Sequence, residues 1–147
     1  MTERWTKTAA FGQFDTTLVN TRWSWSGISK DRRVVVLALW RDRFETTGLE
    51  YHEKKDAPSS DWINLPGNRY RRHDLAWAQQ YCGGTFRVVL ATAEDMVART
   101  RSGTNWTPRP DILMRITYVK PTGQFGAELI EGAPLQPDDG WRNRQKI

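Results

Sequence analysis

The sequence predicts an α+β domain, in which one main helix packs on a strongly bent, mainly antiparallel sheet of about five strands or on a partly closed barrel. Two observations predict this class. The apolar stretches are short and rich in β-branched residues, and a single stretch with helical spacing lies between them. The expected elements lack the strict β-α-β alternation of a doubly wound fold. The 147 residues, of which 38% are hydrophobic, are enough for one such domain.

A hairpin is expected near the start of the chain. Residues 15–26 alternate with period two and place Trp23 and Trp25 on one face, as in a strand. Gly27 and the small polar residues around it supply a turn. Residues 33–44 begin apolar on both faces, which is typical of a central strand, so this segment is the expected second strand.

A long loop and the main helix follow. Residues 46–67 contain two prolines and show no sustained period, and ordered loops of this length are often functional. Asn68 is expected to cap a helix over residues 69–82, which Gly83 and Gly84 would end. One stripe of this helix is expected to face the core and contains Arg71, Leu75, Ala78 and Cys82.

The second half of the chain predicts three more strands. Residues 85–93 are β-branched and apolar and predict a buried strand. Residues 94–110 predict an irregular crossing, because they are polar and end in Pro-Arg-Pro. Residues 111–119 and 124–131 flank Lys-Pro-Thr-Gly, which has the composition of a tight turn, so they predict a hairpin.

A single domain is expected over residues 1–131, followed by a flexible C-terminal tail over residues 132–147. The first dozen residues show no period and are expected to form an arm. The order of the elements resembles that of PUA-like barrels, a group that includes RNA-reading and modified-DNA-reading modules. That resemblance is one of topology and involves no diagnostic motif.

Composition excludes several classes of protein and site. Cys82 is the single cysteine and there are two histidines, so neither an intrachain disulfide nor a zinc site built from several thiolates can form. The longest apolar run has seven residues, far short of the roughly 20 that a membrane-spanning helix needs. The N-terminus has no apolar stretch typical of a secretory signal, so a cytoplasmic or nuclear location is expected.

The charge balance points toward a polyanionic partner. The net charge is +5, with 16 arginines and six lysines. Arginine-rich usage is also what a G·C-rich genome encodes, so the distribution of the charges carries more weight than their sum. Cations bind phosphates and flat aromatic faces bind unpaired bases, so a nucleic-acid site needs both close together.

Cationic and aromatic residues are interleaved in three stretches of the sequence. The predicted nucleic-acid-binding residues are Arg22, Trp23, Trp25, Arg41 and Arg43 in the first hairpin, Tyr70, Arg71 and Arg72 in the helix, and Arg99, Arg101 and Trp106 in the crossing. For each tryptophan the competing interpretation is burial in the core. The helix cluster, expected in the first turn, would oppose the helix dipole, and a bound phosphate would remove that conflict. A solvated basic face paired with the acidic loop is the competing interpretation.

Signals for catalysis are weak. The sequence contains no Gly-rich phosphate loop, no His-Glu-x-x-His and no Gly-x-Ser-x-Gly. His73 and Asp74 are adjacent in sequence and are expected to diverge around the helix, and Cys82 is expected to be a small buried side chain. No catalytic residue, cofactor or metal ligand is therefore predicted.

The preferred hypothesis is a small non-catalytic nucleic-acid-binding domain, with a basic rim on the phosphates and an aromatic pocket for a base. DNA and RNA remain open as partners, a membrane is not expected, and an unpaired sheet edge could form a homodimer. One alternative is a metal-dependent nuclease or other hydrolase that uses acids of the 46–67 loop, such as Glu50 and Glu53. Another is a module with a Trp-lined pocket that binds a small molecule or a protein.

Overall fold

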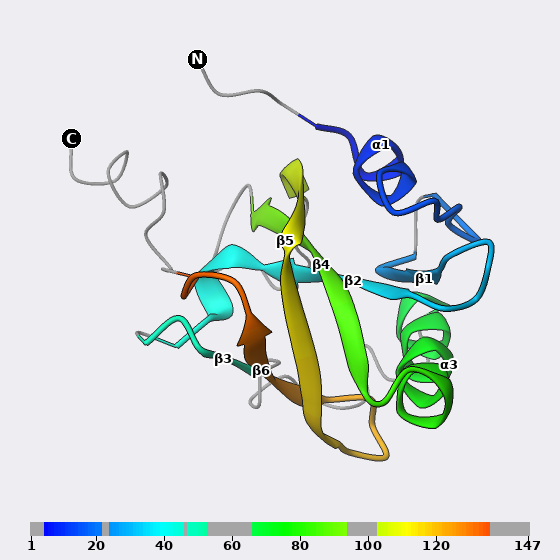
Figure 1. Ribbon diagram of the computed structural model, residues 1–147. Coiled ribbons are helices and arrows are strands. Elements are labelled where there is room, and N and C mark those ends of the chain that lie inside the picture. Colours follow the sequence, from blue (N-terminus) through cyan, green and yellow to red (C-terminus); the bar gives the residue numbers. More distant parts are fainter. Residues whose placement is uncertain (1–4, 22–23, 46, 53–65, 94–102, 136–147) are drawn as a thin grey trace.

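The computed structural model describes residues 5–21, 24–45, 47–52, 66–93 and 103–135. Within these ranges, a six-stranded mixed sheet combines with one main helix and two short helices (Figure 1). The elements are α1 (Lys7–Gly12), β1 (Ser26–Ile28), β2 (Val35–Trp40), the 3-10 helix η1 (Arg41–Arg43), β3 (Glu50–His52), α3 (Pro66–Tyr81), β4 (Thr85–Ala93), β5 (Gly103–Val119) and β6 (Phe125–Glu131). Among the described helices, none has the length and apolar character needed to cross a membrane.

The strands lie in the order β1-β2-β4-β5-β6-β3. β2 and β4 are parallel, and the chain between them includes η1, β3 and α3, whereas the other neighbouring pairs are antiparallel. The α+β class, the single main helix and the predominance of antiparallel pairing are therefore confirmed. In the described part of the chain the sheet is open, with β1 and β3 at its edges, so the partly closed barrel, one of the two expected forms, is not found.

Both faces of the sheet are buried near its centre. One face packs under α3, and this core contains Leu37, Leu75 and Phe86 among its fully buried side chains. The other face packs under α1, where Phe11 and Val89 are fully buried. Because β2 contributes to both faces, all six of its residues are buried. This explains the continuous apolar run that predicted a central strand.

The main helix and the strands that follow it are the elements that the sequence predicts, although α3 and β5 begin earlier than expected. β4 covers the expected residues, and β5 and β6 form the expected hairpin. The end of α3 is also confirmed: Gly83 and Gly84 have positive φ values of 63° and 77°, and Gly84 N–H donates to the carbonyl of Ala78. The start differs, because α3 begins at Pro66 and Asn68 lies inside it.

The first expected strand is wrong for most of its described length. β1 is limited to Ser26–Ile28, and before it the Ser24 N–H donates to the Asn20 carbonyl and closes a turn. The alternation also misjudged the buried face of the described residues, because Leu18 and Ser24 are buried whereas Val19 is 76% exposed. Two further segments differ: α1 forms where an arm is expected, capped by the Thr6 hydroxyl, and β3 forms inside the expected loop.

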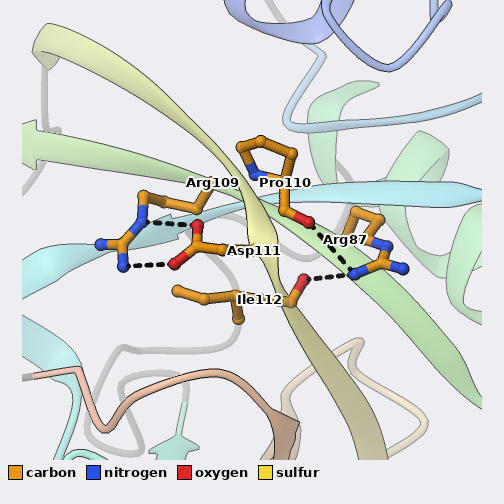
Figure 2. A network of polar contacts seen from close by, with 5 residues as sticks. All are labelled: Arg87, Arg109, Pro110, Asp111 and Ile112. Carbon is orange, nitrogen blue, oxygen red and sulfur yellow. Dashed lines mark hydrogen bonds and ion pairs between the residues drawn. The ribbon is translucent and has the colours of Figure 1, made fainter.

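The crossing expected over 94–110 is wrong from residue 103 onward, because β5 already begins there. A bulge explains the irregular sequence. The partner of Arg87 is Leu113 and that of Val88 is Arg109, so the residues between them leave the ladder. Pro110 has no N–H to donate, and the Arg87 guanidinium donates to the carbonyls of Pro110 and Ile112 at 3.3 and 3.2 Å (Figure 2).

Candidate functional site

A pocket of about 340 Å³ lies between β1, the turn that follows it and α3. This volume is within the range of roughly 300–1,000 Å³ that small-molecule sites occupy. We call it the α3–β1 pocket. Its lining residues are Thr17, Val19, Gly27, Ile28, Ser29, Lys30, Arg32, Tyr70, His73 and Asp74. Positions 70, 73 and 74 share one stripe of the helix, which explains how α3 presents them together.

Asp74 is a buried carboxylate in the wall of this pocket. Its Oδ2 accepts a 2.6 Å hydrogen bond from the Ser26 hydroxyl, and its Oδ1 lies 3.1 Å from Nδ1 of His73. Burial raises the pKa of Asp74 above its ordinary value, while the two hydrogen bonds and the neighbouring imidazole oppose this rise. The expectation that His73 and Asp74 diverge is therefore wrong, since the exposed imidazole reaches back to the carboxylate.

Two cations at the pocket come from the β1–β2 turn. Lys30 lies 3.6 Å from Asp15, and both side chains are mostly exposed. Arg32 is exposed, and its guanidinium lies 5.3 Å from the centre of the Trp77 ring. The Trp77 indole N–H in turn donates to the Arg32 carbonyl, so α3 fixes this part of the turn. The pocket thus has a cationic side on the turn and an aromatic residue, Tyr70, on the helix.

A cluster of three tryptophans lies on the opposite face of the sheet. The ring centres of Trp25 and Trp106 are 5.5 Å apart, and Trp40 lies within 6.2 Å of both. The Lys7 ammonium lies 5.3 and 5.2 Å from the Trp25 and Trp106 rings and donates to the Ser24 carbonyl. Burial lowers the pKa of Lys7. This cluster belongs to the core under α1, although Trp25 remains partly exposed.

The arginines predicted to bind phosphates have different environments. Arg71 is only 9% exposed, lies over the Phe125 ring and donates to Asn68 Oδ1, so it offers little surface to a ligand. Arg72 is partly exposed and donates to the Pro121 carbonyl in the β5–β6 turn. Arg41 and Arg43 form η1 and are partly exposed. Four predicted residues lie outside the described ranges: Arg22, Trp23, Arg99 and Arg101.

The structure brings only some of the predicted residues together. Trp25 and Trp106 meet although they are far apart in sequence, but they lie on the face of the sheet opposite α3 and its residue Tyr70. Arg71 and Arg72 lie beyond the first turn of α3. Their positive charges therefore oppose the helix dipole less than the sequence suggested. Among the described residues, Tyr70 lines the α3–β1 pocket and Trp25 and Trp106 pack under α1, while a hollow shared by all three stretches stays a prediction because Arg22, Trp23, Arg99 and Arg101 lie outside the described ranges.

Sequence reasoning did not select the polar residues of the α3–β1 pocket. Lys30 and Arg32 are part of the basic first stretch, and the turn geometry decides that these two face α3. No sequence pattern marks Ser26 as part of this site, because its hydrogen-bond partner, Asp74, is 48 positions away in the chain. The helical spacing of positions 70, 73, 74 and 77 is visible in the sequence. It places these residues on one stripe of the helix and would have grouped Tyr70 with Asp74.

A second group of polar side chains lies at the β3 edge. Nε2 of His52 is 3.2 Å from Oε1 of Glu45 and 3.7 Å from Oε1 of Glu50. Its other nitrogen, Nδ1, is 2.9 Å from the Tyr118 hydroxyl. These three ionisable residues place one ligand atom each within 4.8 Å of one another, so they have the geometry of a potential metal site.

Comparisons with known proteins do not assign a family or a function to this chain. No family model, no curated protein and no solved structure matches this chain.

Proposed function

We propose that this chain is a nucleic-acid-binding domain that holds a single-stranded segment at the α3–β1 pocket. In this proposal the ring of Tyr70 stacks on a base, while Arg32 and Lys30 contact the sugar–phosphate backbone. The single observation that carries the proposal is the presence of these cations and an aromatic ring around one pocket of about 340 Å³. Phosphate contacts and base stacking are the two interactions that such binding needs.

The backbone of Arg32 gives further support. Its φ of 62° lies in the left-handed region, where glycine and asparagine are favoured over arginine. Non-glycine residues in this region reduce stability, and they concentrate at functional sites. A ligand-binding role for the guanidinium is a reason for an arginine at this position of the turn.

Single-stranded nucleic acid is preferred over duplex because a base must leave the stack to reach Tyr70. The resemblance of the expected element order to that of PUA-like modules favours this assignment by analogy alone. We further propose a cytoplasmic location for the chain. Trp25 and Trp106, which the sequence suggested as stacking residues, are given a structural role in this proposal.

The experiment is a fluorescence anisotropy titration of labelled single-stranded DNA, single-stranded RNA and duplex DNA at two salt concentrations. The proposal expects tighter binding of a single strand than of the duplex, weakening with salt. Tyr70→Ala should reduce the affinity for the single strand by about tenfold, since stacking contributes about 1–3 kcal/mol per base. Binding that is absent, insensitive to salt or unchanged in Tyr70→Ala would overturn the proposal.

A further inference from the structure

We infer that Glu45, Glu50 and His52 form a binding site for a divalent transition metal of the zinc class. The three side chains supply one imidazole nitrogen and carboxylate oxygens, a mixed donor set that suits zinc and its neighbours better than magnesium or calcium, which prefer oxygen alone. The site lies at the edge of the sheet away from the α3–β1 pocket, and it is independent of the proposed nucleic-acid binding.

The spacing of the donor atoms fits a metal. Zinc ligands lie about 2.0–2.2 Å from the ion, which places neighbouring ligand atoms about 3.3 Å apart in a tetrahedron. His52 Nε2 lies 3.2 Å from Glu45 Oε1 and 3.7 Å from Glu50 Oε1. A small rotation of the two partly exposed carboxylates is therefore enough to seat an ion. Their two negative charges balance a divalent cation.

The backbone holds the three ligands together. Glu50 and His52 alternate with the buried Tyr51 along β3, so they lie on the same face of the strand. Glu45 is brought alongside because its N–H donates to the Glu50 carbonyl at 3.0 Å. On the other face, the rings of Phe44 and Tyr51 pack 5.0 Å apart in the core. The ligand-bearing segment is thus fixed by both packing and hydrogen bonding.

A residue outside the trio orients the imidazole. Tyr118 bonds to Nδ1 of His52, and the two rings stack with centres 5.7 Å apart. Gly126 pairs in register with both residues, and its missing side chain leaves the space that the Tyr118 ring occupies. Metal-binding histidines usually have their second nitrogen held in this way, which leaves Nε2 for the ion. Two protein carboxylates and one imidazole leave a further coordination position for water.

The test is isothermal titration of the full chain with zinc chloride, repeated with manganese and magnesium chloride. One zinc ion should bind per chain, and magnesium should bind at least a hundredfold more weakly. His52→Gln and Glu45→Gln should each weaken zinc binding at least tenfold. Tyr118→Phe keeps all three ligands, and we expect it to weaken binding by about tenfold through loss of orientation.

Two controls separate this site from other ligands. Glu131→Gln removes the same charge from the neighbouring strand β6, and Cys82→Ser removes the single thiol, so neither should change the affinity. The Glu45 side chain is 47% exposed, so Glu45→Gln should fold normally. This variant can therefore test the site even if His52→Gln fails to fold. Absence of saturable zinc binding, or zinc binding that persists in Glu45→Gln, would show that the trio is only a set of ion pairs.

Discussion

The Ser26 hydroxyl on edge strand β1 donates a 2.6 Å hydrogen bond to Oδ2 of Asp74 on α3. Ser26 is 1% exposed and Asp74 is 7% exposed, so the bond joins the edge of the sheet to the main helix in an environment with little water. A carboxylate buried in this way is expensive unless its oxygens are hydrogen-bonded. The pair therefore links the stability of the fold to the shape of the α3–β1 pocket.

Ser26→Ala should destabilise the chain by about 1–3 kcal/mol, because it leaves a buried carboxylate oxygen without its donor. The measurement is urea unfolding followed by tryptophan fluorescence. Alanine adds no atom at this position, so a steric clash does not contribute to the expected loss of stability. A variant as stable as the parent chain would mean that water replaces the hydroxyl at Asp74.

Asp74→Asn should change how stability depends on pH. Burial raises the pKa of Asp74 above its ordinary 3.8 in the folded chain. Between 3.8 and that raised value, the folded chain keeps a proton that the unfolded chain has released, so the free energy of unfolding falls as the pH rises through this window. Asparagine does not titrate. The parent chain should therefore lose stability relative to Asp74→Asn on going from pH 3.5 to neutral pH, and parallel profiles would contradict the raised pKa.

Gly126→Ala should destabilise the β3 edge. An added Cβ would fall on the ring of Tyr118, which is rigid and already bonded to His52. Overpacking of this kind costs about 1–3 kcal/mol. Gly12→Ala is the control, because nothing lies within 4 Å of its added Cβ and alanine favours the helical conformation of α1. Equal effects of the two changes on urea unfolding would mean that the ring moves aside freely.

The parts of the fold that the sequence predicted are those governed by local pattern. β4 and the β5–β6 hairpin follow from β-branched runs and a Pro–Gly turn, and α3 follows from its apolar stripe and the glycines after it. The parallel pairing of β2 with β4 was not predicted, since it depends on how α3 crosses the sheet. β3 is three residues long, and a strand that short has no detectable period.

The candidate sites depended even more on tertiary structure. The basic and aromatic composition identified the right residue types, but not which face of the sheet would receive Trp25 or Tyr70. His52 and Tyr118 are 66 positions apart, and only the β5-β6-β3 order brings them together. Pro110 correctly predicted a break in regular structure, but the break is a bulge within β5 and not a loop.

Trp106→Ala and Tyr70→Ala should separate the structural aromatic residue from the binding one. Trp106 is 9% exposed and packs against Trp25 and Trp40, so its truncation should cost about 3–5 kcal/mol of stability. Tyr70 is partly exposed at the pocket, and its truncation should change stability much less while it weakens binding of a single strand. Unfolding and anisotropy titrations on both variants are the measurements. The opposite pattern would move the proposed stacking site to the tryptophan cluster.

Arg32→Gln should lower the salt dependence of single-strand binding. Each phosphate contact on a single strand contributes a slope of about 0.7 to the plot of log affinity against log salt, because it releases a bound counterion. Removing one contact at the pocket should therefore reduce the slope by about that amount. Arg115→Gln is the matched control: it also removes one positive charge, but Arg115 lies on β5 beside Glu128, away from the α3–β1 pocket. If both variants reduce the slope equally, the binding follows net charge and the α3–β1 pocket is not where the strand lies.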